Sequence, residues 1–226
     1  MRSRTGWLLL VVAIGFSVGL AFPYLGLDRA DSRLEVQAAV EYALLVVHIA
    51  TAALALVLGP LQFIPRIRRR RRIHRTIGRA YLLLGVAPSA LCAIPVAIWS
   101  GRLLTQIGLT TAAVLWVITG VLAYRAARRR DFAAHRAWMM RNYALTFLAV
   151  TSRLLTPLLL LAQIPLTDAD PASLGDRAAS MIPVGQTLGW ILNLIIVEIV
   201  LRRGLSTGRT ARAPRPSAPA ASSGTR

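Results

Sequence analysis

Residues 42–79 read YALLVVHIATAALALVLGPLQFIPRIRRRRRIHRTIGR, an apolar run that passes directly into a cluster of arginines. A helix rises about 1.5 Å per residue and the hydrocarbon layer of a membrane is about 30 Å thick, so a span needs about 20 mostly apolar residues. Residues 42–65 meet that length, whereas the arginines after them are costly to place in lipid. The stretch therefore predicts a transmembrane helix that ends at a basic face.

The composition of the whole chain favours the same class of protein. Of its 226 residues 55% are hydrophobic, and 27 basic residues, all of them arginine, stand against 9 acidic ones. A disordered basic protein would be poor in large apolar residues, and a nucleic-acid-binding domain would set its basic residues in a polar surface. We therefore exclude both classes and expect no nucleic-acid partner.

The single cysteine, Cys92, rules out a disulfide within the chain.

Six windows are long and apolar enough to cross a membrane, and they are residues 7–27, 42–65, 80–99, 104–124, 143–164 and 184–201. The fold class is therefore predicted to be all-α, a polytopic transmembrane helical bundle of about six spans. We divide the chain into an N-terminal span with an outer loop (1–40), a five-span membrane core (41–201) and a disordered basic cytoplasmic tail (202–226). The first window also resembles a signal sequence, but its long apolar run favours a true span.

The distribution of arginines predicts the orientation. If the N-terminus is cytoplasmic, 22 of the 27 arginines lie in cytoplasmic segments, and the outer segments hold four arginines and six acidic residues. Positive residues stay on the cytoplasmic side of a membrane. We therefore expect both termini in the cytoplasm of a bacterium, a location in its plasma (inner) membrane, and membrane lipids with anionic headgroups of the inner leaflet as partners.

The three histidines raise the question of a cofactor. Two imidazoles from different helices are the usual axial ligands of a b-type haem. His48 lies 17 residues, about 26 Å, from the end of its helix at Pro65, so it cannot share a metal with the other two. His74 and His135 each precede an arginine, in similar segments 61 residues apart, which fits either an internal duplication or chance. We expect these two at the same cytoplasmic depth, as a candidate haem pair.

The arginines beside these histidines suggest a different chemistry. Arg75, Arg79, Arg136 and Arg141 lie where two helices would re-enter the membrane. The backbone N–H groups of a helix start attract anions, and arginines add to that attraction. The alternative to haem is thus a site for a phosphate, on a lipid headgroup or on a small soluble anion.

Polar residues inside the predicted spans are also candidates, because such residues are costly in lipid. For His48 we weigh a neutral imidazole that hydrogen-bonds to a neighbouring helix against a functional role. Arg153 falls near the middle of the fifth window and needs a partner, for which Glu198 and Asn193 in the sixth window are the candidates. We expect a buried pair of Arg153 with Glu198, and keep a proton or substrate path as the alternative.

Several ordered motifs resemble a known family. They are GPLQF at residues 59–63, HRTIGRAY at 74–81, HRAWMMRNYALT at 135–146, and the later Arg153, Trp190, Asn193 and Glu198. Together they resemble the bacterial family of predicted membrane proteins called domain of unknown function 2306, over roughly residues 41–198. The resemblance implies a membrane protein and points to the same polar residues, but it implies no reaction.

No glycine-rich phosphate loop, zinc-protease helix or serine nucleophile elbow is present, which argues against a self-contained enzyme. We therefore predict an integral inner-membrane protein with a His/Arg site at the cytoplasmic face, as a redox subunit that binds haem or is associated with quinone. The alternatives are a protein that binds or transports an anionic lipid or small anion, and a structural subunit without catalysis. A membrane-protein partner and a homo-oligomer both stay open.

Overall fold

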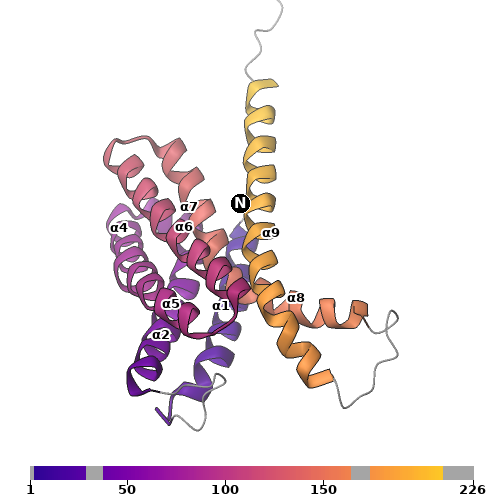
Figure 1. Ribbon diagram of the computed structural model, residues 1–226. Helices are drawn as coiled ribbons and strands as arrows, with labels where there is room; N and C mark the ends of the chain where they lie inside the picture. Colours follow the sequence, from indigo (N-terminus) through magenta and orange to yellow (C-terminus); the bar gives the residue numbers. More distant parts are fainter. Residues whose placement is uncertain (1–2, 29–37, 164–173, 211–226) are drawn as a thin grey trace, which may run out of the picture.

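The computed structural model describes residues 3–28, 38–163 and 174–210, and every regular element in these ranges is helical (Figure 1). The elements in chain order are α1 (Ser3–Ala21), η1 (Phe22–Tyr24), α2 (Ala39–Leu61), α3 (Pro65–Arg69), α4 (Arg71–Ala80), η2 (Tyr81–Val86, a π-helical turn), α5 (Ala87–Trp99), α6 (Leu103–Arg128), α7 (Phe132–Thr146), α8 (Leu148–Gln163) and α9 (Leu174–Thr210). The predicted all-α class is confirmed.

Five stretches are single helices long and apolar enough to cross a membrane: Arg4–Tyr24, Ala39–Leu61, Arg71–Trp99, Leu103–Arg128 and Gly175–Arg203. The fifth predicted window, residues 143–164, is not one straight helix, because α7 and α8 meet at an angle of 46°. The described chain thus has five spans, or six if the bent pair crosses as one. At its end α9 continues to Thr210, so residues 202–210 of the expected disordered tail are helical, while residues 211–226 lie outside the described ranges.

The helix that begins at Arg71 combines a polar and an apolar part. Its 29 residues rise about 43 Å, more than the hydrocarbon layer is thick. The first ten residues, α4, read RRIHRTIGRA, and no residue of α4 is buried. The apolar part begins at Tyr81, which is fully buried. We therefore treat α4 as an interfacial segment that leads into the span.

Small residues allow the helices to approach closely in the core. Gly59 of α2 packs against the ring of Tyr143 from α7, and Gly85 of η2 lies against Ala55 of α2. Without a hydrophobic driving force between helices in lipid, such contacts supply much of the packing energy. They bring α7 and η2 onto α2, and this arrangement determines where the polar residues of those helices meet.

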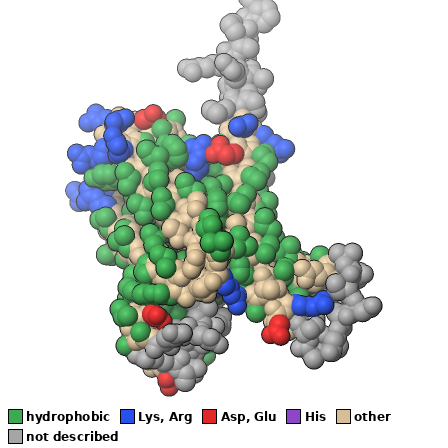
Figure 2. Space-filling view, viewed as in Figure 1, with side chains coloured by type: hydrophobic (Ala, Val, Ile, Leu, Met, Phe, Trp, Pro, Cys, Tyr) green, Lys and Arg blue, Asp and Glu red, His purple; other side chains and the backbone are tan. Residues whose placement is uncertain are grey.

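The basic residues gather at one end of the bundle. Figure 2 shows them over α4 and over the turn between α6 and α7, whereas apolar side chains cover the middle of the same face. The start of α1 belongs to this arginine-rich end, because Gly6 packs against Ile64, just before α3. The separation of charge that the sequence predicts is thus also present in three dimensions.

Candidate functional site: a histidine pair at the arginine-rich end

His74 and His135 occupy equivalent positions on two helices. Each is the fourth residue of its helix, α4 or α7. Asp131 is the N-cap that precedes α7, and its carboxylate accepts a hydrogen bond from the Ala134 N–H at 2.9 Å. The two imidazole rings lie edge to face, with their centroids 6.4 Å apart and their planes perpendicular. The fold therefore brings together two histidines that are 61 residues apart in the sequence.

The His135 ring is fixed by the backbone of the preceding helix. Its Nδ1 lies 2.9 Å from the carbonyl oxygen of Ala123 in α6. Because a carbonyl only accepts hydrogen bonds, Nδ1 must carry the proton, which leaves Nε2 as the nitrogen with a lone pair. A histidine that ligates a metal is commonly oriented by such a hydrogen bond from its other nitrogen.

The surroundings of His74 contain polar atoms without partners among the described residues. Its Nδ1 is buried and makes no hydrogen bond, and the same holds for Nε2 of Gln62. Gln62 directs its amide at α4, since its Oε1 lies 3.2 Å from where a side chain at Gly78 would begin. Buried polar atoms are nearly always hydrogen-bonded, so two exceptions in one region mark the site as unusual.

The surroundings of His74, its burial above all, disfavour the protonated form of its imidazole. Burial lowers the pKa of His74, and the nearby charges of His135 and Arg68 lower it further. A lower pKa means that the ring stays unprotonated to a more acidic pH than an exposed histidine does. The neutral ring is the form that binds a metal.

A buried hydrogen-bond network lies two helical turns further into the bundle. The hydroxyl of Tyr81 donates to Oδ1 of Asn142 at 2.6 Å and lies 2.7 Å from Oγ1 of Thr146. Trp116 donates its indole N–H to the same threonine at 2.9 Å, and Nδ2 of Asn142 donates to Thr119 at 2.9 Å. Asn142 has no exposed surface. The network joins η2, α6 and α7 directly beneath the histidine pair.

Sequence reasoning missed this network, although its signal is present. Tyr81 follows His74 by seven residues and Asn142 follows His135 by seven. Seven residues are close to two full turns, so each polar residue shares a helix face with its histidine. Two polar residues at that spacing after a matched pair of histidines predict that both helices turn the same face inward.

The ion pair of Glu198 differs from the one expected. Its carboxylate accepts from Nε of Arg141 at 2.5 Å and from Nη2 of Arg141 at 3.1 Å, and the guanidinium also lies 4.7 Å from the centre of the Trp138 ring. The expected pair of Arg153 with Glu198 is therefore wrong. The contact joins α7 to α9, close to the arginine-rich end.

His48, Asn193 and Arg153 lie apart from the histidine pair. His48 donates from Nδ1 to the carbonyl oxygen of Ser89 in α5 at 2.9 Å. This contact is the hydrogen bond to a neighbouring helix that was one of the two alternatives for His48. Asn193 accepts from Thr151 at 2.9 Å and donates to the Ala144 carbonyl at 3.0 Å. Arg153 donates to the Ala149 carbonyl of its own helix at 2.9 Å. Three further arginines of the predicted site, Arg75, Arg79 and Arg136, are exposed at the arginine-rich end.

Comparison with known proteins supports the membrane class. Residues 45–201 match the family model described as predicted membrane protein, DUF2306. The chain belongs to the DUF2306 family. The match includes both histidines of the pair, the buried network and the Arg141–Glu198 ion pair. No curated protein and no solved structure matches the chain.

The Arg141–Glu198 contact of this DUF2306 protein leads to a first prediction. Arg141→Leu and Glu198→Leu are each expected to lower the thermal stability of the detergent-solubilised protein, because each leaves one partly buried charge without its partner. The double variant should lose less than the sum of the two, by about 1 kcal/mol in free energy. Arg153→Leu is the matched control, and it should add independently to Glu198→Leu. Additive effects of the Arg141 and Glu198 variants would contradict the pairing.

Proposed function

We propose that the protein is a b-type cytochrome of the bacterial plasma membrane, in which His74 and His135 are the axial ligands of one haem at the cytoplasmic face. The observation that carries the proposal is the 6.4 Å separation of the two ring centroids. An iron bound at about 2 Å by one nitrogen of each ring would hold the centroids about 6 Å apart. The perpendicular ring planes are compatible with two imidazoles that stand upright on opposite faces of a porphyrin.

The number of ligands favours haem over a metal ion held by protein alone. Among the residues that the structure describes, no group of three or more His, Cys, Asp or Glu side chains could hold a metal. Zinc sites require three or four protein ligands. A haem brings four nitrogens of its own and needs only two from the protein, which is the number available here.

The arginines around the histidine pair also suit the two propionate groups of a haem. A haem carries two propionates, and carboxylates bind most strongly to arginine. Arg75 and Arg136 directly follow the two histidines, and Arg79 lies one turn beyond Arg75 on α4. These side chains extend from the same helices as the ligands, so they are near enough to meet propionates at the membrane surface.

A haem in this site would give the protein a one-electron function, in which the iron alternates between ferric and ferrous forms. The site lies at the arginine-rich end, which the positive-inside rule assigns to the cytoplasm. Partners that fit this place are a membrane quinone or a second membrane protein. The residues of the chain contribute the ligation, the orientation of His135 by Ala123, and the cationic surroundings.

The test is the absorption spectrum of the full-length protein, purified in detergent from cells with ample haem. We expect a Soret band and, after reduction with dithionite, the sharp α and β bands of a six-coordinate low-spin haem. A pyridine haemochrome assay should give about one haem per chain, since the described residues offer one such pair. Protein without a Soret band under these conditions would sink the proposal.

A second candidate function rests on the exposed arginines Arg75, Arg79 and Arg136. If these arginines bind a phosphate rather than haem propionates, the protein has a binding site for an anionic lipid or a small anion at the inner leaflet. Colourless protein that retains anionic lipid, and loses it when Arg75 and Arg136 are replaced by alanine, would favour this second function over the first.

A further inference from the structure

The two segments that carry the histidines repeat one another in their contacts as well as in their sequence. Counterparts in the two segments are 61 residues apart, as His74 and His135 are. Gly59 of α2 packs against Tyr143 of α7. Its counterpart, Gly120 of α6, lies against Leu82 of η2, which is the counterpart of Tyr143. The two segments thus exchange partners, as the two subunits of a symmetric dimer do.

Contacts inside each segment recur in the same way. Gly85 lies against Ala55 in the first segment. Their counterparts in the second, Thr146 and Trp116, share a hydrogen bond at 2.9 Å. The histidine pair joins a residue directly to its own counterpart, and so does the tyrosine–asparagine hydrogen bond beneath it. Contacts of that kind lie on a two-fold axis, so the pair stands on the axis of an internal duplication.

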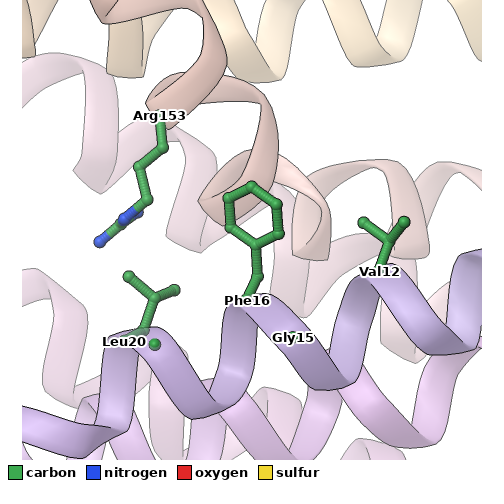
Figure 3. Close-up of a pocket in the computed structure, with 6 residues that line it drawn as sticks. Val12, Gly15, Phe16, Leu20 and Arg153 are labelled. Carbon is green, nitrogen blue, oxygen red and sulfur yellow. The ribbon is translucent and has the colours of Figure 1, made fainter.

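The correspondence ends where α7 ends. In the first segment η2 continues into α5, whereas in the second the chain bends by 46° into α8 (Figure 1). Arg153 of α8 then extends toward Leu20 of α1 (Figure 3). Both histidines come before this bend, so the surroundings of one correspond to those of the other.

Gln62 is the counterpart of the residue that orients His135. The carbonyl of Ala123 accepts from Nδ1 of His135 at 2.9 Å, and Ala123 precedes that histidine by 12 residues. The residue 12 positions before His74 is Gln62. Whereas α6 stays helical beyond Ala123, α2 ends just before Gln62. The first segment therefore offers a side-chain amide where the second offers a carbonyl of a continuous helix.

The amide of Gln62 lies against α4 and lacks a partner there. Gln62 is 5% exposed, and its Nε2 makes no hydrogen bond to the described residues, like Nδ1 of His74. Its Oε1 lies 3.2 Å from where a side chain at Gly78 would begin. Gly78 follows His74 by one turn on the same face of α4. Its counterpart is the buried Met139, so the first segment alone leaves this space for an amide.

An amide side chain fits either tautomer of an imidazole. It carries a donor and an acceptor, and a rotation by half a turn exchanges them. The oxygen of Gln62 can thus take the buried position of Nε2 and accept from a protonated Nδ1 of His74. Such a bond would satisfy two buried polar groups at once. It would also leave Nε2 of the ring with the lone pair, as the Ala123 carbonyl does for His135.

We propose that Gln62 is a positioning residue of the histidine pair, whose amide oxygen accepts from Nδ1–H of His74 and keeps the lone pair of that ring on Nε2. Both rings of the pair then present Nε2, each with its other nitrogen held by the helix that precedes it. The consequence for haem rests on the proposed function, because a histidine whose second nitrogen donates a hydrogen bond is a more basic ligand. The hydrogen bond itself does not depend on haem.

The first test is the tautomer of His74 in haem-free, full-length protein. The chain has three histidines, so ¹⁵N-labelled histidine gives three pairs of ring signals in an NMR spectrum, which single alanine variants assign. At a pH where the rings are neutral, His74 should carry its proton on Nδ1. In Gln62→Leu the proton should move largely to Nε2, the site that an unconstrained neutral imidazole prefers. Gln62→Glu keeps an acceptor and should keep the proton on Nδ1.

Asn193→Leu is the matched control for this test. It also removes a buried amide, one that bonds to Thr151 and to the Ala144 carbonyl, apart from the histidine pair. His74 should keep its wild-type tautomer in this variant. A wild type with the His74 proton on Nε2 would overturn the proposal, and so would a Gln62→Leu variant with the proton still on Nδ1.

The second test is the affinity and the reduction potential of the haem-loaded protein. Gln62→Leu should bind haem about tenfold more weakly and have a higher potential, because its His74 is a less basic ligand. Gln62→Glu should restore the affinity and lower the potential below that of the wild type, since a negative charge favours ferric iron. Asn193→Leu should keep the wild-type potential. A structural role of Gln62 alone would not shift the potential in opposite directions.

The two tests separate the proposal from the proposed function. A haem-loaded wild type whose affinity and potential do not change in either Gln62 variant would overturn the role of Gln62 and leave the cytochrome assignment standing. A wild type without haem would end the cytochrome assignment, and the tautomer of His74 would then decide the role of Gln62 by itself.

Discussion

Haem is expected to be absent from His74→Ala and from His135→Ala, each of which should purify without a Soret band. Each substitution removes one of two axial ligands at a site where the described residues offer no third histidine. The effect should be near-complete in both variants, because a haem held by one imidazole at the membrane surface is bound far more weakly than one held by two. The measurement is the reduced-minus-oxidised spectrum at matched protein concentration.

The third histidine of the chain is the matched control for this prediction. His48→Ala removes an imidazole from α2, where it hydrogen-bonds to Ser89, and should leave the spectrum as in the wild type. Imidazole added to His135→Ala should restore part of the band, because it can occupy the space that the side chain leaves. If His48→Ala loses the haem while His135→Ala keeps it, the assignment of the ligands is wrong.

Replacement of Gly59 by alanine is expected to destabilise the protein by about 3 kcal/mol, the upper part of the range for overpacking. The added methyl group would overlap the ring of Tyr143, which is itself held by a hydrogen bond from its hydroxyl to the Leu56 carbonyl at 3.2 Å. Neither the α2 backbone nor the buried ring can move without separating α2 from α7. The measurement is the unfolding temperature of the detergent-solubilised protein.

Gly15→Ala is the matched control for Gly59→Ala, since it also adds a methyl group to a glycine within a span but meets no atom within 4 Å. Its stability should equal that of the wild type or exceed it slightly, as alanine is the better helix former. In the double variant Gly59→Ala with Tyr143→Val, the smaller side chain should restore part of the loss. Equal unfolding temperatures for Gly59→Ala and Gly15→Ala would contradict the close packing of α2 and α7.

Much of the fold follows from local properties of the sequence. The apolar window 104–124 falls within α6, and most of window 42–65 falls on α2, which ends at Leu61, because hydrophobic length largely decides whether a segment spans a membrane. The depth of His74 and His135 in the membrane can also be predicted from their neighbours in the sequence, because each histidine is followed within a few residues by the apolar segment that enters the bundle. The prediction that these two histidines form a pair was therefore within reach of the sequence.

The partner of Glu198 could not be predicted from the sequence, because the prediction assumed a straight helix. Counting depth along residues 143–164 assumes one straight helix, which would place Arg153 near the middle of the membrane. The chain instead bends by 46° between Thr146 and Leu148, and Arg153 reaches α1 beside Leu20. Arg141 lies before the bend, and it is Arg141 that α7 presents to Glu198.

The sequence by itself determined the membrane class, the approximate ends of the spans and the separation of arginines from apolar segments, since each depends on neighbours along the chain. The tertiary structure brings His74 and His135 together, as the sequence predicts, and it alone decided two other contacts: Tyr81 with Asn142 and Arg141 with Glu198. These contacts depend on how far each helix is rotated about its axis and where it bends. Close packing at Gly59 and Gly85 and the break after Thr146 determine both, and they arise from contacts between residues far apart in the sequence.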